Sequence, residues 1–94
     1  MDKELKKYLI NLGFSEKQIS QMCLTYPSLK LVTYEQAMEN IDILSYYGYP
    51  VEDIDSLIQA NPLFIIVEPN FLEEILNDID GEVESVLKND PFVI

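Results

Sequence analysis

Carboxylates are the most numerous side chains in this sequence that could do chemistry, with 17 Asp and Glu among 94 residues. Two carboxylates facing each other across a cleft can act as general acid and base, and several converging carboxylates can bind calcium. The densest cluster, residues 78–82 (DIDGE), resembles part of a calcium loop. An EF-hand would need an oxygen ligand two residues before this cluster and a Glu at its twelfth position, where the sequence has Leu76 and Leu87. We therefore expect no metal site, and we expect the acids on solvated helix faces and in first helical turns.

Nucleophilic and soft metal-ligating side chains are scarce. The sequence has no His and one Cys, Cys23, which excludes Ser-His-Asp and Cys-His catalysis and zinc sites built from His and Cys. Cys23 falls on the apolar stripe of an expected helix, so we predict a buried structural thiol. Every acidic residue falls on an expected polar face or in a turn. We therefore predict a protein that is not an enzyme and that uses no cofactor.

Charge is distributed unevenly along the chain. Residues 1–34 contain five Lys and three acidic residues, whereas residues 48–94 contain one Lys and 11 acidic residues. The net charge is −11 and there is no Arg, which disfavours nucleic acid and favours a basic protein surface as partner. Any phosphate contact must use the lysines of the N-terminal third, which are Lys3, Lys6, Lys7, Lys17 and Lys30.

The sequence repeats itself with a period of 35 residues. Gly13 and Gly48 are separated by this distance, and so are Pro27 and Pro62. A third copy ends at Pro91 and has an Asn, which tolerates a left-handed backbone, at the glycine position, Asn77. Apolar positions also align: Ile19 with Ile54 and Val83, Met22 with Leu57 and Val86, and Cys23 with Ile58 and Leu87. We predict one domain, residues 1–94, with repeat units at about 2–32, 33–67 and 69–94.

Each copy is expected to consist of two helices and a proline-led turn. The Gly or Asn of each copy should end its first helix with a positive φ. Ser15 with Gln18, and Thr33 with Gln36, match capping boxes that would begin the second and third helices. The inner face of the third helix should carry Ala37, Ile41 and Leu44.

Residues 63–67 (LFIIV) have the composition of a buried strand. No other segment offers a partner strand, so we expect a buried turn and an extended linker there. A short fifth helix is expected near 70–76, and a sixth near 80–89 with Asp80 as its N-cap. No segment has the ~20 apolar residues of a membrane span, and the N-terminus carries no targeting signal, so we expect a cytoplasmic protein.

Residues 12–15 (LGFS), Ile19 and Pro27 form a pattern that recurs in the later copies as residues 47–49 (YGY), Ile54 and Pro62, and as residues 76–77, Val83 and Pro91. This pattern resembles the repeat of the mitochondrial transcription termination factor (mTERF) family. The resemblance implies an all-α fold, a right-handed stack of about two and a half to three helix-turn-helix repeats, each with a short 3₁₀ turn that begins at the proline. It also implies a curved superhelix whose basic concave face binds double-stranded nucleic acid.

Three functions are compatible with these patterns. The leading hypothesis is a non-catalytic helical-repeat module that binds a macromolecule, with a protein partner favoured by the net charge. The first alternative is nucleic-acid binding or a transcription-related activity, as the mTERF resemblance implies. The second arises because residues 12–15, followed by a helix, also resemble the loop of ubiquitin-associated domains, which implies ubiquitin binding through the Gly13 loop.

An apolar segment follows the last proline of the repeat pattern. The matching segments of the first two copies lead on to another helix, but none follows here. If these side chains face outward they form an exposed apolar patch, so we identify a candidate association surface at Phe92, Val93 and Ile94. We expect a monomer or a weak dimer.

Overall fold

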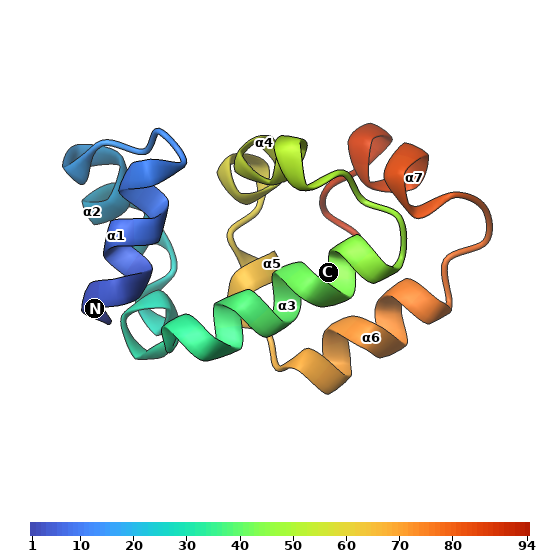
Figure 1. Cartoon of the computed structure of the whole chain (residues 1–94), viewed down its shortest axis with the longest axis horizontal. Coiled ribbons are helices and arrows are strands. Elements are labelled where there is room, and N and C mark those ends of the chain that lie inside the picture. Colours follow the sequence, from blue (N-terminus) through green and yellow to red (C-terminus); the bar gives the residue numbers. More distant parts are fainter.

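Seven α-helices and two 3₁₀ helices form along the chain in the computed structural model, which describes residues 1–94 (Figure 1). They are α1 (Lys3–Asn11), α2 (Glu16–Thr25), η1 (Pro27–Leu31), α3 (Tyr34–Tyr46), η2 (Val51–Asp53), α4 (Ile54–Ala60), α5 (Leu63–Ile66), α6 (Pro69–Asn77) and α7 (Val83–Asn89). No residue is in a strand, and residues 63–67 form the single turn α5 and an extended Val67. The expected all-α fold class is therefore confirmed.

The third helix, α3, connects the two ends of an elongated molecule that measures 35 × 22 × 20 Å. It packs against α1, α5 and α6. The pair α1 and α2 lies at one end of the long axis, and α6 and α7 lie at the other (Figure 1). Because α3 and α6 run side by side in the same direction, their C-terminal ends lie at the same end of the molecule (Figure 1).

The core is one cluster of 20 buried apolar residues, and it contains two of the three sets of positions that the repeat aligns. Ile19, Ile54 and Val83 are buried at equivalent places in α2, α4 and α7. A second aligned set is also buried, namely Cys23, Ile58 and Leu87. The set between them is buried only at Leu57, since Met22 and Val86 are half-buried. The expected inner face of α3 is confirmed as well, with Ala37, Ile41 and Leu44 all buried. The thiol of Cys23 is therefore a core group, as the apolar stripe predicted.

The first helices of the first two repeat copies, α1 and α3, end in the same way. Gly13 and Gly48 have φ of 108° and 95°, which only glycine adopts without a steric cost. The N–H of Phe14 donates to the Leu9 carbonyl, and Tyr49 makes the equivalent bond to the Leu44 carbonyl. This is the Schellman pattern, in which the side chain after the glycine also returns to the core. Both helix ends are as predicted.

The third helix end differs from the prediction. Asn77 is the last residue of α6, Asp78 continues in the right-handed region with φ −86°, and no residue other than glycine has a positive φ. The left-handed residue is Gly81, with φ 110°. Gly81 lies four residues further along, where the reversal carries no Cβ cost, so Asn77 need not supply it. As a consequence, α7 begins at Val83 with Glu82 as N-cap, and the prediction that Asp80 caps it is wrong.

The residues before the three repeat prolines, Pro27, Pro62 and Pro91, leave their helices in a similar conformation. Tyr26, Asn61 and Asp90 have φ/ψ of −126/80°, −151/97° and −143/92°. A following proline disfavours the α region, so these residues are extended while their N–H groups still bond the carbonyl four residues back. The chain after the proline varies. The 3₁₀ helix expected in every copy is present as η1 in the first, is replaced by α5 in the second, and is reduced to a turn at residues 91–92 in the third.

One predicted capping box is complete and the other is half formed. Ser15 and Gln18 exchange both bonds, at 3.1 and 2.8 Å. Thr33 Oγ1 accepts from the Gln36 N–H at 3.1 Å, but the Gln36 amide does not return to Thr33. It bonds instead to carbonyl groups at the end of α5, which lack partners within that short helix.

Two amides one turn apart on α3, Gln36 and Asn40, hold the end of α5, and we call this pair the amide clasp. Gln36 Nε2 donates to the Ile66 and Val67 carbonyl oxygens at 2.8 and 3.2 Å. Asn40 Nδ2 donates to those of Phe64 and Val67 at 3.0 and 2.8 Å. Asn40 is fully buried, and its Oδ1 has no partner. The clasp therefore fixes the proline corner of the second copy against α3.

A third amide links the second corner to the chain after α7. Asn61 is fully buried, and its Nδ2 donates to the Pro91 carbonyl at 3.0 Å. Its Oδ1 accepts from the Leu63 N–H at 3.1 Å. Asp90, at the equivalent place in the third copy, accepts from the Phe92 N–H at 3.0 Å. The same turn is thus made by an amide inside the molecule and by a carboxylate at its surface.

Candidate interaction surfaces

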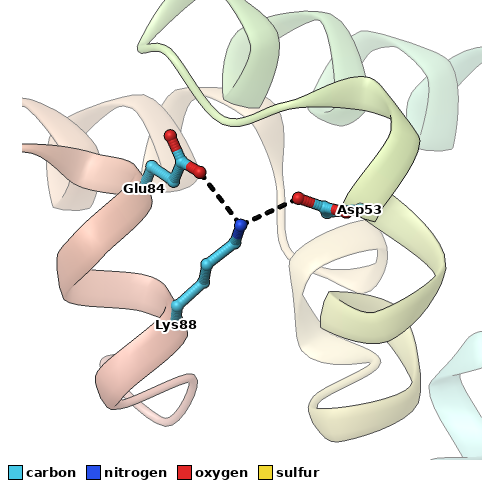
Figure 2. A network of polar contacts seen from close by, with 3 residues as sticks. All are labelled: Asp53, Glu84 and Lys88. Atoms are coloured by element: carbon cyan, nitrogen blue, oxygen red, sulfur yellow. Dashed lines mark hydrogen bonds and ion pairs between the residues drawn. The ribbon is translucent and has the colours of Figure 1, made fainter.

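The single lysine of residues 48–94, Lys88, is exposed and is neutralised by carboxylates of the same chain. Lys88 Nζ lies 2.8 Å from Asp53 Oδ2 and 2.9 Å from Glu84 Oε2, and Figure 2 shows it between these carboxylates of η2 and α7. These two hydrogen bonds raise the pKa of Lys88 above its ordinary value. Lys88 also lies 6.0 Å from the centre of the Tyr49 ring. No cation of this half of the chain is therefore free to balance its other acids.

Unpaired acids gather where α3 and α6 both end. We define the acidic end as Glu73, Glu74, Asp78, Asp80 and Glu82, all of which are exposed and form no ion pair. Two adjacent hollows open there and share Tyr47 and Asn77. No lysine lines either hollow. The C-terminal ends of two parallel helices add the negative poles of their dipoles to these charges.

Two tyrosines lie beside the acidic end. Tyr46 is 85% exposed, and its ring centre is 5.4 Å from that of Tyr47 in an edge-to-face arrangement. Burial and the nearby charge of Glu73 raise the pKa of Tyr47. A cationic side chain placed here can pair with carboxylates and contact an aromatic face at the same time. The acidic end is thus suited to lysine or arginine side chains of a partner.

The five candidate phosphate-contact lysines do not gather in one place. Lys6 and Lys30 line a common hollow between α1, α2 and η1. Lys3, Lys7 and Lys17 are exposed but do not line it. Lys6 also pairs with Glu16 at 3.2 Å. The structure therefore brings two of the five together and leaves the other three separate.

The remaining predicted surfaces are only partly exposed. Phe92 is 62% exposed, whereas Val93 and Ile94 are half-buried and pack against the core. In the Gly13 loop, Phe14 is buried and the Ser15 hydroxyl is used by its capping box. In both the C-terminal segment and the Gly13 loop, some of the side chains that the sequence offers to a partner are thus already used within the fold.

Sequence reasoning missed the tyrosine pair and the clasp. The signal for the clasp was an amide at position 40, between inward-facing Ala37 and Ile41 on the same helical stripe. The signal for the pair was two aromatics next to a helix stop, Tyr46 and Tyr47. Neither signal predicts which residues the side chains contact, because those residues are more than 20 positions away in the chain.

No helix in the structure combines the length and the apolar character needed to cross a bilayer. No three His, Cys, Asp or Glu side chains lie close enough together to hold a metal ion.

Comparison with known proteins found no matching family model, no matching curated protein and no matching solved structure.

Proposed function

We propose that this chain is a non-catalytic binding module whose acidic end binds a basic segment of a partner protein. One observation carries the proposal: three exposed acids without internal cations, Glu73, Glu74 and Glu82, line the two hollows that share Tyr47, and Asp78 and Asp80 follow in the loop after α6. Tyr46 packs edge-to-face on Tyr47 at the C-terminal end of α3. Complementary charge of this kind speeds association and selects partners. The tyrosines add contact area and cation–π attraction, which a plain acidic patch lacks.

The scaffold for this surface is proposed to be a stack of mTERF-like repeats. The equivalent helix ends at Gly13 and Gly48 support this, as do the equivalent conformations of Tyr26, Asn61 and Asp90. The differing helix end near Asn77 belongs to the third copy, which carries all five acids of the acidic end. On this proposal the third copy has exchanged the repeat's regular helix end for a binding surface.

A charge-neutralising comparison tests the function. A fluorescent peptide of alternating Arg and Gly is titrated at several salt concentrations against the protein and against the double variant Glu73→Gln/Glu74→Gln. The matched control is Glu35→Gln/Glu39→Gln, which removes two exposed charges from the N-terminal half of α3. We expect at least fivefold weaker binding for the first double variant, and less than twofold for the control. Equal weakening by both would mean that only net charge matters, and would refute a site at the acidic end.

A further inference from the structure

The N-terminal pair of helices forms a hollow whose chemistry is opposite to that of the acidic end. It has a volume of about 340 Å³ and lies between α1, α2 and η1. Its lining residues are Met1, Lys6, Glu16, Ile19, Ser20, Cys23, Leu24 and Lys30. Four of these are apolar and two are lysines, so an apolar floor carries cations at its edge.

The rim of this hollow presents an apolar side chain that the chain itself does not cover. Leu24 is 73% exposed, although it is one residue from the buried Cys23. Large apolar side chains exposed around a concave surface mark sites where another molecule packs. Covering Leu24 together with the floor of the hollow requires an apolar ligand surface.

The two lysines of the rim are available to a ligand. Lys30 forms no ion pair, and Lys6 pairs only with the exposed Glu16, at 3.2 Å. An exposed pair of this kind contributes little free energy, so Lys6 can exchange Glu16 for a carboxylate of a partner. Residues 1–34 carry a formal charge of +2, from five lysines and three acids, whereas the whole chain carries −11. An acidic ligand is therefore attracted to this part of the chain and repelled by the rest.

We propose that this hollow binds an acidic amphipathic helix of a partner protein, with its apolar side chains over Leu24 and its carboxylates on Lys6 and Lys30. A groove between packed helices accepts the apolar face of such a helix. A nucleic-acid backbone would supply the negative charge but no apolar group to cover Leu24, and the other three lysines lie outside the hollow. The two ends of the molecule would then bind partners of opposite charge. This inference does not depend on the function of the acidic end.

Binding of a model helix tests the proposal. The probe is a fluorescein-labelled 18-residue peptide with Leu at heptad positions a and d, and with Glu and Ala elsewhere. Leu24→Ser and Lys30→Glu change the hollow, and Leu31→Ser and Lys7→Glu are the matched controls. All four residues are exposed, and the two control residues do not line the hollow. We expect each hollow variant to weaken binding of the peptide at least fivefold and each control to weaken it less than twofold, at equal thermal stability.

Several results would overturn the proposal. Absence of measurable peptide binding, or equal weakening by hollow and control variants, would remove the site. Self-association of the protein alone that Leu24→Ser abolishes would assign the hollow to a second copy. Binding to phosphatidylserine vesicles that the hollow variants abolish, without peptide binding, would assign it to an anionic membrane.

Discussion

Replacing Asn40 with Ala tests how the amide clasp holds the second proline corner. Asn40 is fully buried, and its Nδ2 donates to the carbonyl oxygens of Phe64 and Val67 at 3.0 and 2.8 Å. The substitution removes both donors and leaves a residue with high helix propensity on α3. Any loss of stability therefore reports the contacts with the corner and not the helix itself.

The expected magnitude follows from these contacts. Burying the Phe64 carbonyl without this donor costs roughly 1–3 kcal/mol, and the weaker loss at Val67, which keeps the Gln36 donor at 3.2 Å, costs roughly 0.5–1.5 kcal/mol. Removing the unpartnered Asn40 Oδ1 offsets roughly 1 kcal/mol, and the better helix propensity offsets roughly 0.5 kcal/mol. With a small cavity term added, the net loss is about 2 kcal/mol, which for a domain of this size lowers Tm by about 8–16 °C.

Urea and thermal unfolding followed by circular dichroism measure this loss. Glu39→Ala, an exposed change on the same helix, is the control and should alter the free energy of unfolding by less than about 0.5 kcal/mol. Asn40→Asp places a charged acceptor against two carbonyl oxygens, so it should cost more than Asn40→Ala, and less at low pH, where the protonated carboxyl can donate. If Asn40→Ala were as mild as Glu39→Ala, the clasp would not hold the corner.

Three further outcomes are expected. Gly48→Val should lower the free energy of unfolding by roughly 1–2 kcal/mol or more, because Gly48 has a φ of 95°. Asn77→Gly should also destabilise the fold, since Asn77 is helical and gains nothing from glycine. If denaturant unfolding showed Asn77→Gly to be stabilising, it would contradict the chain reversal at Gly81. Hydrogen bonds from the N–H groups of Leu5, Tyr34 and Glu4 lower the pKa of Asp2 below 3.8, so this carboxylate stabilises the fold above that pH, and the stabilisation disappears as pH falls through the lowered pKa. Unfolding of the protein and of Asp2→Asn between about pH 6 and pH 2 should therefore differ most at the higher pH, and a constant difference would contradict this. Duplex DNA at near-physiological salt should bind no tighter than about 10⁻⁴ M by fluorescence anisotropy, and micromolar binding would favour the nucleic-acid alternative.

Local signals predicted the helix ends wherever glycine or a cap residue alone determines them. Gly13, Gly48 and the Ser15–Gln18 box behave as their types require, because each acts on its own neighbours in the chain. The alignment, together with the tolerance of Asn for a left-handed backbone, predicts the role of glycine for Asn77, and this prediction is wrong. A true glycine stands four residues later, and the chain reverses there instead.

Local sequence signals did not predict contacts between segments that are distant in the chain. The apolar stripe of α3 placed a polar residue, Asn40, among buried neighbours, but its partners are carbonyl groups of a turn 24 to 27 residues away. The excess of acids in residues 48–94 follows from the sequence alone. Their proximity to Tyr46 and Tyr47 depends on the parallel packing of α3 and α6, which no local spacing predicts.

The central claim is that the acidic end, and not the net charge, binds a basic partner. Titrating ¹⁵N-labelled protein with the Arg–Gly peptide and following backbone amide shifts by NMR tests it most directly. We predict the largest shifts at the tyrosine pair and the ends of the two helices, namely at Tyr46, Tyr47, Glu73, Glu74 and Gly81. Shifts should be small at Glu35 and Glu39, the exposed acids of the first half of α3. Shifts of similar size at Glu35, Glu39 and the acidic end, or shifts confined to residues 1–34, would contradict it.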